Sequence, residues 1–123
     1  MQQRHTTVAV VDDDASILQA TEALLVAQGF RASLFGSAEE FLASGAADQA
    51  DCLLLDINLG RLSGIELRRL LNSTHSGLPV IFMTALEDDA TCQTALRTGC
   101  IALLHKPFQA KQLGDAITKA CTA

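Results

Sequence analysis

Four short apolar runs alternate along the chain with stretches that have helical periodicity. The runs cover residues 8–11, 52–55, 80–83 and 101–104, and residues 31–35 form a weaker segment of mixed apolar and polar character. Apolar runs of about four residues, bounded by turn-forming residues, are typical of strands buried on both faces of a parallel sheet. The mixed segment at 31–35 suits an edge strand of that sheet.

Five helices are predicted, and in four of them the inward-facing residues can be named from helical periodicity. These positions are Ile17, Thr21, Leu24 and Leu25 in the first helix, Ile65, Leu67, Leu70 and Leu71 in the third, Ala95 and Leu96 in the fourth, and Leu113, Ala116, Ile117 and Ala120 in the last. The second helix is expected to begin at a capping box formed by Ser37 and Glu40. Glycines 29, 45 and 99 are expected to end the first, second and fourth helices. The fourth helix is predicted over residues 88–98 and the last over about 109–120.

Strand and helix thus alternate strictly, which predicts an α/β fold with one doubly wound, five-stranded parallel sheet. The flavodoxin-like (βα)5 arrangement, with strand order 2-1-3-4-5, fits five such units and a second strand at the edge. Residues 1–123 are expected to form a single domain with an ordered core at about 6–121. No output domain is expected within this chain.

Composition and charge narrow the classes of function. The chain is 49% hydrophobic with a formal charge of -5, and its apolar runs are far shorter than the roughly 20 residues of a membrane-spanning helix. A cytoplasmic protein without membrane association is therefore expected, and the acidic balance disfavours nucleic-acid binding. The four cysteines are Cys52, Cys92, Cys100 and Cys121, and they form no C-x-x-C pair. Neither a structural disulfide nor a zinc site is expected from them.

Polar side chains gather where the predicted strands end. Asp12 and Asp13 follow the first apolar run, Asp56 and Thr84 follow the next two, and Lys106 comes shortly after the last. The carboxyl ends of parallel strands share one edge of the sheet, and ligands bind there at the switch point, here between the first and third strands. The sequence therefore predicts that three carboxylates, one hydroxyl and one ammonium surround a common pocket.

Such a set suits a divalent cation. Three converging carboxylates repel one another unless a cation lies among them, and Mg²⁺ prefers carboxylate and carbonyl oxygens. Asp13 and Asp56 are candidates for direct ligands, and Asp12 for one that acts through a metal-bound water. The backbone carbonyl of Asn58 is the candidate for a further ligand.

The same pocket suits phosphoryl transfer. The Asp56 carboxylate is a candidate nucleophile, because aspartyl-phosphate formation is a known covalent route. The ammonium of Lys106, the hydroxyl of Thr84 and the N–H of Ala85 are expected to hold the equatorial phosphoryl oxygens. Each residue alone also fits a solvated loop, so the prediction rests on their combination at four strand ends.

Five motifs carry a resemblance to a known family. They are residues 10–14 (VVDDD), 54–56 (LLD), 63–67 (SGIEL), 82–85 (FMTA) and 106–108 (KPF). With these motifs in order and at the family's spacing, the whole chain resembles the receiver domain of two-component response regulators. Residues 35–42 (FGSAEEFL) resemble the FixJ/NarL-type subgroup, whose receivers often precede a helix-turn-helix DNA-binding domain.

This resemblance implies that Asp56 accepts a phosphoryl group from the phosphohistidine of a histidine kinase or from a phosphotransfer protein. It implies that Asp12 and Asp13 organise Mg²⁺, and that Thr84 and Lys106 contact the phosphoryl group. The protein would be a signalling receiver rather than an enzyme, catalysing only its own phosphorylation and dephosphorylation. Its signal would pass through altered protein contacts, with a homodimer or effector protein on the face of the fourth helix, fifth strand and fifth helix. It would act alone or as the regulatory part of a transcriptional regulator.

Two positions depart from the family pattern. Leu103 stands where the family usually has the aromatic residue that moves inward with the threonine, and Gly60 stands where the loop after the acidic strand usually has proline. Both departures favour an atypical readout. They support a second hypothesis, a receiver-like interaction module with weak or no dependence on phosphate.

A third hypothesis is a haloacid-dehalogenase-like phosphatase, which also uses a nucleophilic Asp and Mg²⁺ on a parallel sheet. Asp12 and Asp14 match its paired acids superficially, but the short chain and the lack of a cap domain argue against it. Asp14 is instead expected to cap the first helix. The acidic residues 87–89 are expected to be a solvated helix start, and His105 an exposed strand-end residue.

Overall fold

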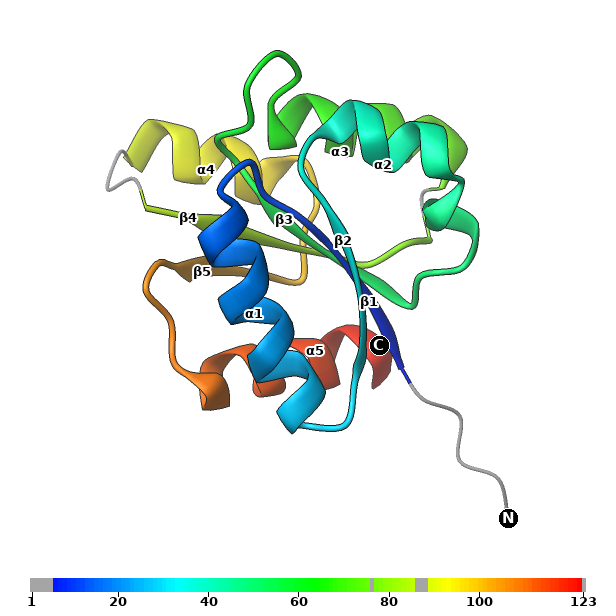
Figure 1. Ribbon diagram of the computed structural model, residues 1–123. Helices are drawn as coiled ribbons and strands as arrows, with labels where there is room; N and C mark the ends of the chain where they lie inside the picture. The colour runs from blue at the N-terminus through cyan, green and yellow to red at the C-terminus, as the bar shows by residue number, and fades with distance from the viewer. Residues whose placement is uncertain (1–5, 76, 86–88, 123) are drawn as a thin grey trace.

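The computed structural model describes residues 6–75, 77–85 and 89–122, and in this part of the chain five strands alternate with five α-helices (Figure 1). The strands are β1 (Thr7–Val11), β2 (Arg31–Phe35), β3 (Cys52–Asp56), β4 (Val80–Thr84) and β5 (Ala102–His105). The helices are α1 (Ala15–Ala27), α2 (Ala38–Ser44), α3 (Gly64–Thr74), α4 (Asp89–Arg97) and α5 (Ala110–Thr122), with a short 3-10 helix, η1 (Ala46–Asp48), after α2. None of these described helices is long and apolar enough to cross a membrane.

The strands form one parallel sheet in the order β2-β1-β3-β4-β5. This confirms the predicted doubly wound α/β fold and its strand order. The reversal of order lies between β1 and β3, where Val11 is paired with Leu55. Residues that follow β1 and residues that end β3 are therefore neighbours at one edge of the sheet.

Helices cover both faces of the sheet, with α2, α3 and α4 on one side and α1 and α5 on the other (Figure 1). Side chains on one face of the sheet, such as Leu55 and Phe82, pack with Phe41 of α2 and Leu67 of α3. Side chains on the opposite face of the sheet pack with helices α1 and α5. Every residue of β3 and β4 is buried, which explains why these strands appear in the sequence as uninterrupted apolar runs.

Capping groups set the helix starts. Asp14 caps α1 as predicted, since its side chain accepts hydrogen bonds from the N–H groups of Ser16 and Ile17. Ser37 caps α2, but the predicted reciprocal bond is wrong, because the Glu40 carboxylate accepts from the N–H of Gly36. The complete capping box lies instead at Ser63 and Glu66 of α3.

Two predicted core leucines are exposed. Leu70 is 47% exposed on α3 and Leu96 is 53% exposed on α4. On α3, Leu67 and Leu71 are buried in the core, and Gly64 and Arg68 are buried as well. The Arg68 guanidinium donates to the carbonyls of Gly99 and Leu78, so it joins α3 to the loops before β5 and β4.

Element bounds differ slightly from the predicted ones. The last strand begins at Ala102 rather than at residue 101, and α5 extends to Thr122. The predicted start of the fourth helix at residue 88, with the acidic pair at 87–88, lies outside the described residues. Asp89 begins α4, and His105 is exposed as predicted.

Candidate functional site

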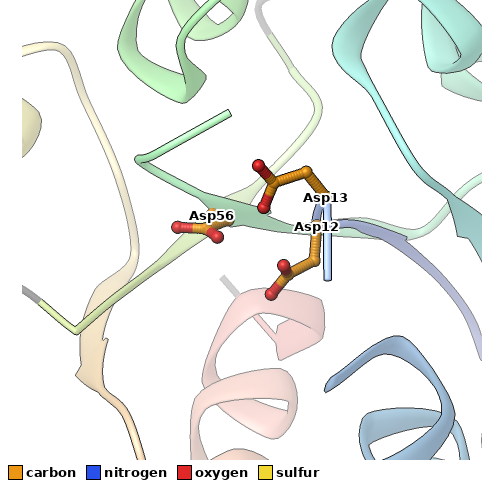
Figure 2. Close-up of side chains that lie close together, drawn as sticks. All are labelled: Asp12, Asp13 and Asp56. Atoms are coloured by element: carbon orange, nitrogen blue, oxygen red, sulfur yellow. The ribbon is translucent and has the colours of Figure 1, made fainter. Parts of the chain in front are cut away.

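Three carboxylates meet at the end of the sheet where β1 and β3 lie side by side. Asp12 and Asp13 follow β1 directly, and Asp56 is the last residue of β3 (Figure 2). Each offers one carboxylate oxygen, and these oxygens all lie within 4.8 Å of one another. Asp12 and Asp56 are buried, whereas Asp13 is exposed. The structure thus brings together the three acids that sequence reasoning had assigned to neighbouring strand ends.

The ammonium of Lys106 lies between two of these acids. Its Nζ donates to Oδ2 of Asp12 at 2.6 Å and to Oδ2 of Asp56 at 3.0 Å. The exposed fractions of the side chains are 12% for Lys106, 0% for Asp12 and 7% for Asp56. The ion pair is therefore largely withdrawn from water, and Lys106 lies on the same rim of the sheet as Asp56.

Backbone N–H groups hold the other oxygen of each buried carboxylate. Oδ1 of Asp56 accepts from the N–H of Asn58 at 2.9 Å, and Oδ1 of Asp12 accepts from the N–H of Asp14 at 2.9 Å. Bonds to the backbone two residues further on are typical of Asp at a turn. Each carboxylate is thus oriented by its own loop and leaves one oxygen facing Lys106.

Burial and charge shift the pKa values of the paired groups. Burial raises the pKa of the Asp56 carboxyl above its ordinary range, and the Asp12 carboxylate acts in the same direction, against the Asn58 N–H and Lys106. Burial lowers the pKa of Lys106, but its hydrogen bonds and charge interactions with Asp12 and Asp56 outweigh this and raise it. Lys106 is therefore firmly protonated at neutral pH.

An open hollow of about 390 Å³ lies over these groups. Besides the acids and Lys106, its lining includes Ile17 of α1 and residues of the loops after β3 and β4, namely Asn58, Leu59, Gly60 and Ala85. Thr84 is only 1% exposed at the end of β4, so the next residue, rather than Thr84, lines the hollow. Asp56 is one of the residues that line the hollow. The roles predicted for Thr84 and for the Asn58 carbonyl remain predictions.

Sequence reasoning missed two residues that shape the site. Leu59 lies in the loop after β3, yet it is only 6% exposed because it packs into the core beside α3. Gly64 begins α3 directly against the backbone of Asp56, and its N–H donates to the carbonyl of Ile57. The Ser63-x-x-Glu66 spacing was the available signal for the helix start, but nothing in one sequence shows how closely Gly64 approaches Asp56.

Gly64→Ala is expected to destabilise the protein through this contact. A Cβ at position 64 would lie 2.2 Å from the carbonyl oxygen of Asp56, which is backbone and cannot rotate away. Overpacking of this kind costs about 2–3 kcal/mol of unfolding free energy, to be measured by urea denaturation. The matched control is Gly77→Ala, where a Cβ meets nothing within 4 Å. Equal stability of the two variants would contradict the proposed close packing.

The donor set fits a divalent metal ion. Three carboxylates lie close together and one ammonium pairs with two of them, so the pocket keeps an excess of negative charge. Asp13 and Asp56 are the predicted direct ligands for Mg²⁺. Asn58 comes two residues after Asp56 and lines the same hollow. A hard cation with oxygen ligands and retained waters would balance this charge.

Mg²⁺ is therefore expected to stabilise the folded protein. At a concentration about 100 times its Kd, a ligand bound only by the folded state adds about 2.7 kcal/mol, visible as a rise in Tm. Ligand carboxylates must be ionised, so the effect is lost as the pH falls. Because the pKa of Asp56 is raised, this loss begins above the ordinary carboxylate range. An equal rise in Tm for Asp56→Asn would exclude this site as the place of binding.

Comparison with known proteins assigns the family. The family model described as the response regulator receiver domain matches residues 8–118. Nodulation protein W of Bradyrhizobium diazoefficiens is 35% identical over 113 residues, which cover 92% of this chain and 50% of that protein. The transcriptional regulatory protein FixJ of the same species is 31% identical over 113 residues, covering 92% of this chain and 55% of FixJ. The chain spans about half the length of these curated relatives.

Solved structures of receiver domains are also similar to this chain. A response regulator receiver domain protein from Clostridium thermocellum has a TM-score of 0.89 and 27% identity, covering 95% of this chain and 94% of that one. The crystal structure of FixJ-N has a TM-score of 0.87 and 29% identity, covering 98% of this chain and 96% of that one. With the acids and the lysine at the ends of a 2-1-3-4-5 sheet, the chain belongs to the receiver domain family of two-component response regulators.

Proposed function

We propose that this receiver accepts a phosphoryl group on Asp56. The supporting observation is the contact of a buried, backbone-oriented Asp56 carboxylate with the Lys106 ammonium beside a second and a third acid. The proposed donor is the phosphohistidine of a histidine kinase or of a phosphotransfer protein. That donor reaches Asp56 through the open hollow over the strand ends.

In the proposed reaction, a carboxylate oxygen of Asp56 forms a bond to phosphorus as the bond from phosphorus to the donor's imidazole nitrogen breaks. The Asn58 N–H holds Oδ1 of the nucleophile in place, and the Lys106 ammonium is positioned to contact an equatorial phosphoryl oxygen. Thr84 and the N–H of Ala85 are the proposed contacts for another oxygen. Bound Mg²⁺ would supply further neutralisation of the phosphoryl charge.

The protein is proposed to be a signalling receiver and not an enzyme for a separate substrate. Its chemistry is limited to its own phosphorylation and dephosphorylation. The haloacid-dehalogenase-like alternative is not supported, because the Asp14 carboxylate that it requires as a partner of Asp12 is used to cap α1.

The proposed output is a change of protein contacts at the face formed by α4, β5 and α5. Leu103 of edge strand β5 is half-buried and packs against the core cluster that contains Phe82 and Ala95. In the sheet, Leu103 is paired in register with Phe82, the middle residue of β4. Because the curated relatives are about twice as long, the receiver is proposed to act alone or as the regulatory part of a longer regulator.

Incubation with acetyl phosphate and Mg²⁺, followed by intact-mass measurement, tests the proposal. A folded sample is expected to gain one phosphoryl mass that is lost on mild alkaline treatment, as for an acyl phosphate. Chelation of Mg²⁺ is expected to suppress the gain. A folded sample that gains no labile phosphoryl group would refute the proposed function.

The phosphate-independent interaction module remains the second candidate, on the observation that an aliphatic Leu103 occupies the half-buried position in β5. The two candidates differ in one result. Asp56→Asn leaves partner binding unchanged if the module is independent of phosphate, whereas the leading proposal requires a difference between phosphorylated and unphosphorylated protein.

A further inference from the structure

Two thiols meet at the end of the sheet opposite the acids. Cys52 is the first residue of β3, and Cys121 lies in the last turn of α5. Ala120, the residue before Cys121, belongs to the same core cluster as Cys52. Cys121 itself lines a hollow together with Asp51, the residue before Cys52, and both cysteines are free thiols. Strand and helix are far apart in sequence, so the sequence alone gave no sign of this pair.

The two thiols differ in their access to solvent. Cys52 is fully buried in the core cluster that also contains Ala120 of α5. Cys121 is exposed and lines an open hollow of about 370 Å³, together with Asp51 and Pro79. A reagent in solution can therefore reach Cys121 directly, whereas Cys52 can react only with a group already attached to its neighbour.

We propose that Cys121 is a thiol-modification site for low-molecular-weight disulfides such as glutathione disulfide, and that Cys52 resolves the adduct into a reversible Cys52–Cys121 disulfide. The Cys121 thiolate attacks one sulfur of the reagent, forming a mixed disulfide and releasing one thiolate. The Cys52 thiolate then attacks the Cys121 sulfur and releases the second. Overall, two protein thiols are oxidised, one reagent disulfide is reduced to two thiols, and the two thiol protons pass to the released thiolates.

The environment of the two thiols changes their pKa values and therefore the rate of this exchange. Burial raises the pKa of Cys52 and also that of Cys121, and the Asp51 carboxylate acts in the same direction on both. The neighbouring Cys52 thiol acts in the opposite direction on the pKa of Cys121. Because the thiolate is the nucleophile, the pair is expected to react slowly at neutral pH and faster in alkaline buffer.

The new bond would tie the last turn of α5 to the start of β3. These segments are already packed together through Ala116, Ile117 and Ala120, so the bond closes across an existing contact. It constrains the unfolded chain more than the folded one and should raise Tm. The acids lie at the opposite ends of the strands and keep their geometry.

The test treats the folded, reduced protein with glutathione disulfide at about pH 8.5, near the ordinary thiol pKa. After alkylation of the remaining thiols, the expected intact mass shows the loss of two hydrogens and no glutathionyl group, and peptide mapping links Cys52 to Cys121. The Tm is expected to rise by several degrees and to return on reduction. The matched variant Cys121→Ser is expected to form no intramolecular disulfide.

Three results would overturn the proposal. One is a stable glutathionyl adduct on Cys121 with Cys52 still free, which means that the buried thiol does not resolve it. Another is pairing of Cys52 with Cys92 or Cys100. The third is an unmodified Cys121 after treatment, verified in a sample whose circular dichroism matches that of the untreated protein.

Discussion

Asp56→Asn is expected to reduce phosphoryl incorporation from acetyl phosphate to background. The amide has nearly the shape of the carboxylate, so the variant should fold and keep the bond from the Asn58 N–H to its side-chain oxygen. It lacks the ionised oxygen that attacks phosphorus. The measurement is intact mass after incubation with acetyl phosphate and Mg²⁺, in parallel with the unmodified chain.

Asp115→Asn is the matched control for this variant. Asp115 is an exposed acid on α5, away from the strand ends that carry the site, and its replacement makes the same chemical change. This control is expected to incorporate phosphoryl groups as the unmodified chain does. Substantial incorporation by Asp56→Asn would mean that another residue is the acceptor.

Lys106→Met is expected to have the second largest effect, on both stability and phosphorylation. The ammonium forms ion pairs with two buried carboxylates, so its removal leaves Asp12 and Asp56 close together without that compensation. Breaking a buried ion pair in this way costs about 3 kcal/mol, which urea denaturation in Mg²⁺-free buffer measures. The rate of phosphorylation should fall by roughly a hundredfold, because one donor to the transferring group is lost.

Mg²⁺ separates the two effects of Lys106→Met. A divalent cation among the acids would relieve their repulsion, so the variant should gain more stability from Mg²⁺ than the unmodified chain does. Phosphorylation should remain slow even in saturating Mg²⁺. Lys111→Met, at an exposed lysine of α5, is the control and should change neither quantity. A variant as stable as the unmodified chain without Mg²⁺ would show that the ion pair contributes little.

The strand order and the convergence of the acids could be predicted because both depend on burial. Strands β3 and β4 are buried throughout, so they appear in the sequence as apolar runs that end at a polar residue. In a parallel sheet these ends share one edge, and Asp56 then lies near Asp12 as a consequence of topology alone. A single sequence is sufficient for this step.

Contacts that depend on side-chain direction could not be predicted in the same way. Leu70 and Leu71 are adjacent leucines, but they point about 100° apart around α3. Leu71 is therefore buried, whereas Leu70 is exposed. Arg68 is buried only because two loop carbonyls accept its guanidinium hydrogens. The approach of Gly64 to Asp56 and the nearness of Cys121 to the start of β3 likewise depend on how helices sit on the sheet.

Asp56 is the proposed acceptor of the phosphoryl group, and reduction with borohydride tests this assignment most directly. Borohydride converts an aspartyl phosphate into homoserine, a permanent mark that peptide mass spectrometry assigns to one residue. After treatment with acetyl phosphate, homoserine is predicted at position 56 in the sample with Mg²⁺ and not in the chelated sample. Homoserine at Asp12 or Asp13 instead, or at no position in a folded sample, would contradict the account.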